Sequence, residues 1–276
     1  MQSSDRPRTA VVIGASLAGM LTAHVAARHF ERVIVVDRGE PIHGLEPRKA
    51  VPQEKHVHLL LQRGKRVMEA LLPGFLAELE RRGAVVADAS RDVRMFHGRW
   101  KRPFDTGIYT HYCSRGLIDH VVRERLRANP RIAFEPATRV IGLVTGVSGM
   151  VRGVTLEADG GGARTIDAEL VIDAGGRGSQ ASRWLTALGY PEVRTSQVTA
   201  RLGYGTRLYK KLRAYDDAWK VLLVLPRPPA ARRMGVISPI EGDRWMVTTG
   251  GWLGDCPGEG EAEFLEFLRG LPDPAI

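Results

Sequence analysis

The chain has 276 residues, 43% hydrophobic and 26% charged, which suits one large or two modest globular domains and excludes a low-complexity or fibrous protein. Its net charge of +9 is compatible with nucleic acid or an acidic membrane surface as a partner, but the basic residues are spread along the chain. We therefore favour an arginine-rich surface that meets an anionic cofactor, with no nucleic-acid partner.

The cysteine content and the first apolar run indicate a protein of the reducing cell interior. The two cysteines, Cys113 and Cys256, are too few for a disulfide framework. The first apolar run contains glycine turns and ends in a helix with His24 and His29, so it fits neither a signal peptide nor a membrane span. We expect a cytoplasmic protein without stable membrane insertion.

The N-terminal stretch predicts a strand, a glycine turn, a helix and a second strand. Thr9 to Ile13 is a short, mostly β-branched run, as expected of a strand buried on both faces. The turn GASLAG occupies 14–19 and leads into a helix ending near His29. A second buried run, 32–36, ends on Asp37. This order is the βαβ fingerprint of dinucleotide-binding proteins.

Each part of the fingerprint has a physical role in holding a dinucleotide. Gly14 permits the tight turn, Gly19 allows helix and strand to pack closely, and Asp37 can accept hydrogen bonds from an adenosine ribose. Ser16 replaces the usual second glycine; its side chain crowds the phosphate, although its hydroxyl can cap the helix and donate to phosphate oxygen. The alternative is an ordinary capped helix in another α/β protein, but the complete order favours nucleotide binding.

A long loop rich in Gly, Pro and charge follows Asp37, and loops of this length are usually functional or disordered. The histidines His56 and His58 lack further Cys or His at ligand-like spacing, so no metal site is predicted. We expect polar residues within and after this loop to face a cofactor: Arg48, Lys49, Gln53, Lys55, His56 and His58.

Alternating helices and strands continue to about residue 190. Helices are predicted over 58–72, 75–82, 117–128 and 180–188, and strands over 84–87, 108–113, 132–134, 139–145, 151–157, 165–168 and 170–173. Arg115 stands at the entrance of a helix, where a guanidinium can reach a bound phosphate. The stretch DAGGRGS at 173–179 is a second glycine turn between strand and helix. It either places N–H groups beside the first turn or is a plain connection, and two such turns in one chain favour the first.

The pattern changes after about Pro191. Strand-like runs at 198–208, 219–225, 234–238 and 244–249 alternate apolar and polar residues, as antiparallel strands with one wet face do, and a helix is predicted over 261–271. The expected fold is therefore α/β. A Rossmann-like domain with β-hairpin insertions covers 1–190, and a second, mainly antiparallel β-sheet domain covers 191–276.

Three features together resemble the FAD-dependent monooxygenases of the single-component aromatic hydroxylase type: GASLAG with Asp37, Arg115 before its helix, and DAGGRGS. The flavin epoxidase and hydroxylase branch looks closer. The stretch AVPQEKHVHLLLQRG at 50–64 is similar to that branch, as is the ending GDRWMVTTGGWLGDCPGEGEAEFLEFLRGLPDP. The resemblance covers nearly the whole chain and implies a Rossmann-like FAD-binding domain with a β-rich substrate domain.

The resemblance also implies site residues, although it assigns no catalytic side chain and no metal ligand. The FAD pyrophosphate would lie on the first turn, formed by Gly14, Ala15, Ser16, Leu17, Ala18 and Gly19. The other implied contacts are Asp37 at the adenosine ribose, Arg38 and the backbone of Val140 at the adenine, Arg115 near the phosphates, and Asp173 and Gly175 in a motif that serves both FAD and passing NADPH.

The implied activity is monooxygenation. Tightly bound FAD, reduced by NADPH or NADH, would use molecular oxygen to hydroxylate or epoxidise a small organic substrate. The family's third FAD motif, a Gly-Asp pair before a helix, has only a two-residue match at Gly242-Asp243, in a predicted hairpin turn. We therefore expect a truncated chain with an incomplete substrate domain. The alternatives are a catalytically impaired or non-catalytic FAD-binding remnant needing a completing chain or a homo-oligomer, and a related flavin reductase or halogenase.

Overall fold

The computed structural model describes residues 7–48, 51–147, 149–158, 160–212 and 219–276. The chain divides into two compact units, the first made of 1–50 and 119–196 and the second of 51–118 and 197–276. This division differs from a single boundary near residue 190, because β5 (Val93–Phe96) pairs in parallel with β13 (Val221–Val224) and so joins the C-terminal sheet.

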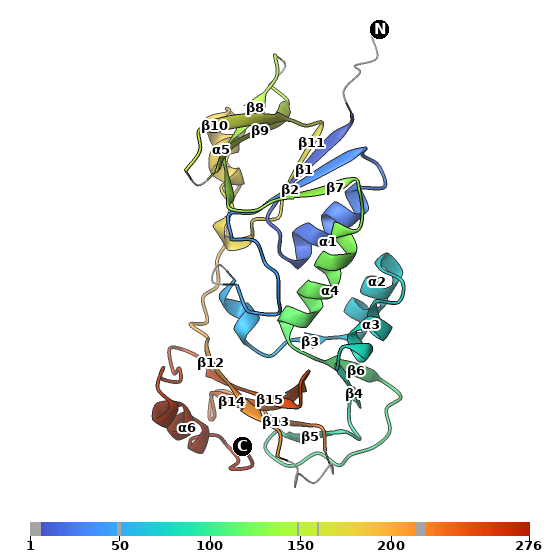
Figure 1. Ribbon diagram of the computed structural model, residues 1–276. Helices are drawn as coiled ribbons and strands as arrows, with labels where there is room; N and C mark the ends of the chain where they lie inside the picture. The colour runs from blue at the N-terminus through green and yellow to red at the C-terminus, as the bar shows by residue number, and fades with distance from the viewer. Residues whose placement is uncertain (1–6, 49–50, 148, 159, 213–218) are drawn as a thin grey trace. The chain divides into compact units, whose positions relative to one another are not determined.

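The first unit is built on a four-stranded parallel sheet with the order β11-β1-β2-β7 (Figure 1). Its strands are β1 (Thr9–Ile13), β2 (Arg32–Val36), β7 (Ile132–Glu135) and β11 (Leu170–Asp173). The predicted strands 9–13 and 32–36 are confirmed with the same bounds. Because the strands are parallel and Ile13 lies opposite both Asp173 and Val36, the two glycine turns and Asp37 leave the sheet at one edge.

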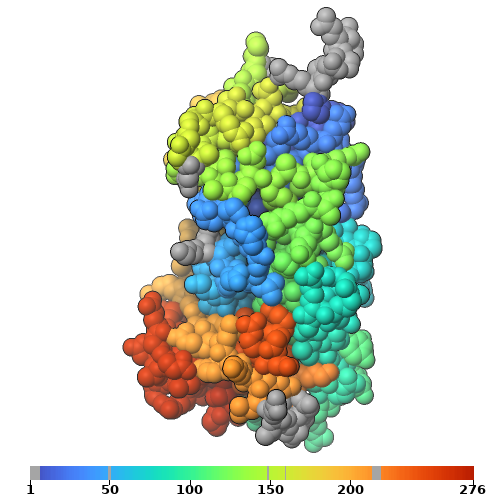
Figure 2. Space-filling view, viewed as in Figure 1, coloured from blue at the N-terminus to red at the C-terminus, as the bar shows by residue number. Residues whose placement is uncertain are grey.

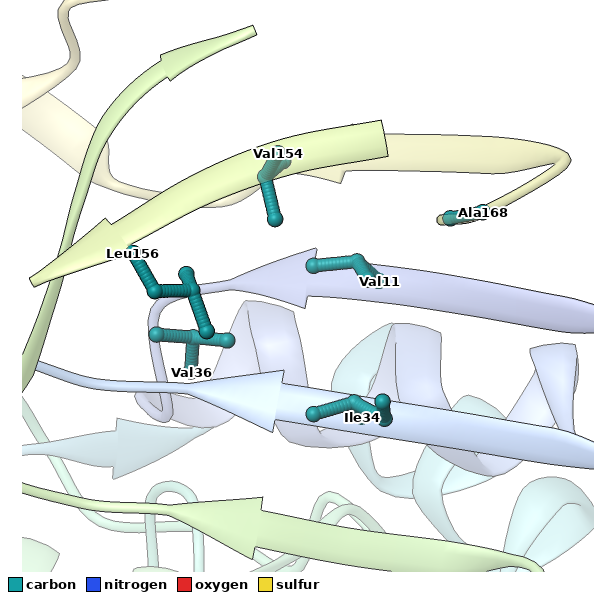
Figure 3. Packing of buried hydrophobic residues seen from close by; sticks show 6 residues of the cluster. All are labelled: Val11, Ile34, Val36, Val154, Leu156 and Ala168. Carbon is teal, nitrogen blue, oxygen red and sulfur yellow. The ribbon is translucent and has the colours of Figure 1, made fainter. Parts of the chain in front are cut away.

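Layers cover both faces of this sheet. Helix α1 (Leu17–Ala26) packs against β1 and β2 on one side. On the other lies an antiparallel sheet of β8 (Thr138–Thr145), β9 (Val151–Ala158) and β10 (Ala163–Asp167). A cluster of buried aliphatic side chains packs these two sheets together. Each fully buried side chain stabilises the fold by about 1.5–3 kcal/mol. Figure 3 shows the buried members of this cluster: Val11, Ile34, Val36, Val154, Leu156 and Ala168.

The bounds of helices α1 and α4 differ slightly from the expected ones. Helix α1 ends at Ala26 because the N–H groups of Arg28 and His29 bond three residues back and close the helix with a tighter turn. Helix α4 (Arg115–Arg127) begins two residues earlier than predicted, because the Ser114 hydroxyl accepts the Leu117 N–H at 3.1 Å and caps it. Helix α5 (Ala181–Ala187) and the 3-10 turn η2 (Gly176–Gly178) follow β11.

The second unit has a five-stranded sheet in the order β12-β15-β14-β13-β5, antiparallel except at its β13–β5 edge. The strands not yet bounded are β12 (Gly203–Lys210), β14 (Arg233–Ile240) and β15 (Arg244–Gly251). Helix α6 (Glu261–Arg269) packs Phe264 and Leu268 against one face of this sheet. The expected second, mainly antiparallel sheet is confirmed.

A smaller sheet, in the order β3-β6-β4, completes the second unit. Its strands are β3 (Leu59–Leu60), β4 (Val85–Asp88) and β6 (Tyr109–Tyr112), and the remaining elements are η1 (Pro52–Lys55), α2 (Gln62–Leu71) and α3 (Phe75–Arg81). The predicted helix over 58–72 is wrong in its first turn, because β3 pairs with β6 there. Among the described residues, none of the helices has the length and apolar character needed to cross a bilayer.

Candidate nucleotide-binding site

The first glycine turn follows β1 and has no room for side chains at two positions. The Gly14 N–H donates to Val36 O at 2.7 Å, and Gly14 has φ +99°. A Cβ atom on Gly14 would lie 2.7 Å from Ala174 O, and one on Gly19 would lie 1.8 Å from Gly14 O. Glycine at these positions therefore lets the turn, α1 and the β11 end pack together, as the sequence predicts.

Asp37 connects the end of β2 to this turn. Its Oδ2 accepts the Ala15 N–H at 2.7 Å, and its Oδ1 accepts the Gly39 N–H at 2.8 Å. A carboxylate oxygen has more than one acceptor position, so each can accept a further hydrogen bond from a ligand hydroxyl. Asp37 thus shapes the turn in addition to presenting acceptors at the sheet edge.

Ser16 is the N-cap residue of α1, with φ −80° and ψ 178°. The expected cap by its hydroxyl is wrong, because the side chain makes no cap hydrogen bond. Its Oγ instead accepts from Nη2 of Arg48 at 3.2 Å. With no side chain occupying the cap, the first N–H groups of α1, including those of Leu17 and Ala18, are oriented for an anion.

Arg48 holds the loop after Asp37 against the glycine turn. Its Nη1 donates to Ala15 O at 3.0 Å, and its Nη2 lies 2.9 Å from Oδ2 of Asp119 on α4. The Arg48 and Asp119 side chains are only 9% and 4% exposed, so this is a buried ion pair. The sequence predicted Arg48 as one of the polar loop residues but did not indicate Asp119. The feature that could have indicated Asp119 is its position beside the apolar face of its helix.

The same loop also contacts α4 further along. The Arg127 guanidinium donates to Ile42 O at 3.0 Å, and in Figure 2 the loop lies at the surface of the first unit beside this helix. Lys49, expected to face a cofactor, lies outside the described residues. The loop is therefore attached to the glycine turn through Arg48 and to α4 through its middle.

The second glycine turn, DAGGRGS, is organised by Asp173. Its Oδ1 accepts the Gly175 N–H at 2.7 Å, and its Oδ2 accepts the Ser179 hydroxyl. A Cβ on Gly175 would lie 2.8 Å from Oδ1, so the turn needs glycine there. The Ala174 N–H donates to Ile13 O at 2.8 Å, which brings this turn directly beside the first.

Arg38 and Val140 lie close to the same edge. The Arg38 guanidinium stands beside Gly178, with Nη2 3.6 Å from the position of a Cβ on that glycine. The Thr138 N–H donates to Asp37 O at 3.0 Å, which ties the start of β8 to the strand end. The Val140 side chain packs into the core and the ladder slips just after it, so its backbone is the part suited to a ligand contact.

Arg115, His56 and His58 belong to the second unit. Arg115 is the first residue of α4 and stands one helical turn before Asp119. Among the described residues, no group of three or more His, Cys, Asp or Glu side chains is arranged to hold a metal ion. The predicted phosphate contact of Arg115 stays a prediction.

The residues of the first unit fit the nucleotide end of a dinucleotide. They form a glycine cradle that Cβ atoms would fill, a helix start without a side-chain cap, and an acid at the adjacent strand end. Oriented N–H groups and the positive end of the helix dipole stabilise phosphate. Such an arrangement is suited to an anion whose sugar donates hydrogen bonds to the acid.

Comparisons with known proteins agree with this fit. The family model described as FAD dependent oxidoreductase matches residues 10–185. Protein Rv3254 of Mycobacterium tuberculosis is 29% identical over 261 residues, which are 88% of this chain and 53% of that protein. The chain thus spans about half the length of the curated relative that it matches.

Solved structures share the fold at low sequence identity. The p-nitrophenol 4-monooxygenase PnpA from Pseudomonas putida DLL-E4 has a TM-score of 0.67 and 18% identity, over 97% of this chain and 64% of that one. The myxobacterial chondrochloren halogenase CndH has a TM-score of 0.64 and 18% identity, over 96% of this chain and 59% of that one. At such identities the likeness establishes the fold alone.

Proposed function

Because the chain belongs to the FAD dependent oxidoreductase family, we propose that it is the cofactor-binding and substrate-binding part of an NAD(P)H-driven monooxygenase. This enzyme hydroxylates or epoxidises a small organic substrate with molecular oxygen. The observation that carries the cofactor part is the shared sheet edge where both glycine turns and Asp37 meet. A monooxygenase of the same fold supports the reaction type. The activity of the whole protein is part of the proposal.

The first unit is proposed as the FAD-binding domain. The pyrophosphate would lie on N–H groups between Gly14 and Gly19, and the adenosine ribose would donate to Asp37. Arg38 and the backbone of Val140 would flank the adenine. Asp173 and Gly175 would shape the second turn against the cofactor.

The second unit is proposed as the substrate domain. Bound FAD would supply the redox and oxygen chemistry, and the protein would bind, orient and exclude water. The antiparallel sheet gives a rigid surface for this purpose, since α6 and the small sheet pack on its two faces. No side chain is proposed as an acid or base in the reaction.

The test begins with the absorbance spectrum of the purified protein. Bound oxidised flavin, bleached by NADPH or NADH without oxygen and restored by air, would support the proposal. Tighter binding of NADH than of FAD, measured by calorimetry, would contradict the cofactor assignment, and absence of flavin after reconstitution would favour a non-catalytic protein. Because a halogenase shares this fold, product analysis with and without added bromide distinguishes oxygenation from halogenation.

A further inference from the structure

A histidine and two threonines form a hydrogen-bonded chain on the main sheet of the second unit. Nδ1 of His56 lies 2.8 Å from Oγ1 of Thr206 on β12, and that oxygen lies 2.8 Å from Oγ1 of Thr248 on β15. The Val57 N–H donates to Oγ1 of Thr248 at 3.3 Å. Thr248 is buried, and His56 is half-buried. These hydrogen bonds therefore connect the buried Thr248 hydroxyl to the His56 imidazole.

The available donors and acceptors fix the direction of these hydrogen bonds. Within the described residues, Oγ1 of Thr248 has only the Val57 N–H and Thr206 as partners, so its own proton can go only to Thr206. The Thr206 proton then goes to Nδ1 of His56, which must act as the acceptor. The opposite direction would leave the buried Thr248 hydroxyl proton without an acceptor, which costs free energy. His56 therefore carries its proton on Nε2.

The Nε2 atom is accessible and has no protein partner within the described part of the chain. The buried side-chain nitrogens without a partner there belong to His111 and Trp184, not to His56. Burial lowers the pKa of His56, and the nearby charges of His58 and Lys55 lower it further, which favours the neutral ring. His56 thus presents an N–H donor next to the positive charge of Lys55.

Aromatic and apolar side chains flank this donor. The Tyr204 ring lies 5.5 Å from the His56 ring between centroids, tilted by 46°. Tyr204, Thr206 and Leu208 lie on the same face of β12, because side chains two residues apart in a strand point to the same side. Tyr204 and Leu208 are exposed, at 42% and 51%. Tyr209, the residue after Leu208, donates to Glu261 of α6 and lies on the other face of the strand.

We propose that His56 is a substrate-binding residue whose Nε2–H donates to a carboxylate or phenolate oxygen of a planar aromatic compound resting against Tyr204. The donor, the exposed ring and the adjacent lysine match the acceptor, the flat face and the negative charge of such a compound. This inference rests on the proposed function, because it names the substrate class of the proposed substrate domain.

The first experiment measures the tautomer. Nitrogen NMR of the FAD-loaded protein labelled in its histidines should show the His56 proton on Nε2, and a proton on Nδ1 would overturn the inference. Thr206→Val should abolish this preference, because it removes the donor to Nδ1, and Thr206→Ser should restore it. A preference that survives Thr206→Val would count against the chain.

The second experiment measures binding of salicylate, a planar aromatic anion, by NMR titration. Replacement of the donor by His56→Phe should weaken binding about tenfold, the effect of one hydrogen bond to a charged group. The control His97→Gln, at an exposed histidine elsewhere in the second unit, should change affinity less than about twofold. Unchanged affinity in His56→Phe, or no saturable binding to the unaltered protein, would overturn the inference. FAD content, measured in the same samples, judges the proposed function separately.

Discussion

Arg48→Met is the substitution that best tests how the loop after Asp37 is held. The Arg48 guanidinium bonds Ala15 O, Ser16 Oγ and Asp119 Oδ2 at 3.0, 3.2 and 2.9 Å. Methionine keeps much of the volume and removes the charge and all three donors. We expect both lower stability of the first unit and weaker FAD binding.

The magnitude follows from burial. Removing one partner of a buried ion pair costs about 3–5 kcal/mol, because the other charge is left without compensation. Because both side chains are buried, a loss of about 3–5 kcal/mol is expected for Arg48→Met. The Arg139–Glu157 pair of the same unit has the same 2.9 Å separation but is 59% and 41% exposed, so Arg139→Met should cost about 0–1 kcal/mol.

The assay is urea unfolding, followed by circular dichroism and tryptophan fluorescence, with FAD affinity measured on the same variants. Combining Arg48→Met with Asp119→Leu should recover part of the lost stability, because neither charge of this pair is then left buried without the other. FAD affinity should fall about tenfold in Arg48→Met, because the Ala15–Ser16 turn loses its pre-organisation. If Arg48→Met costs no more than Arg139→Met, the buried pair does not hold the loop.

Three further predictions concern other parts of the chain. Gly14→Val should abolish FAD retention and also destabilise the first unit by about 2–4 kcal/mol, because the side chain meets Ala174 O at a positive φ; full flavin content with native stability would refute this. Asp37→Ala should weaken FAD binding by about 1–3 kcal/mol in a calorimetric titration, since it removes the acceptor of the Ala15 N–H as well as the proposed ribose contact, and an unaltered affinity would exclude a role of Asp37 in binding. Burial and then Glu241 raise the pKa of Cys113 to about 12, so this thiol stays protonated below that pH. Iodoacetamide at pH 8 should therefore label exposed Cys256 and spare Cys113 until the protein unfolds, and mass spectrometry showing equal labelling would contradict the packing.

Local patterns in the sequence determined the nucleotide-binding half of this protein well. Strands β1 and β2, the glycine turn and Asp37 were predictable because each depends on nearby residues: β-branched runs, a positive φ and a spacing set by one βαβ unit. The second turn was also predictable as a turn. Its closeness to the first follows once β11 pairs beside β1.

Only the tertiary structure decided which distant residues meet. Arg48 and Asp119 are 71 positions apart, His56 and Thr206 are 150 apart, and β5 joins a sheet whose other strands lie beyond residue 202. Such pairs leave no period or motif in the sequence, because they depend on how loops close and which faces pack. The Ser16 hydroxyl shows the consequence: helix position predicts a cap, but a buried arginine from a remote loop takes the oxygen instead.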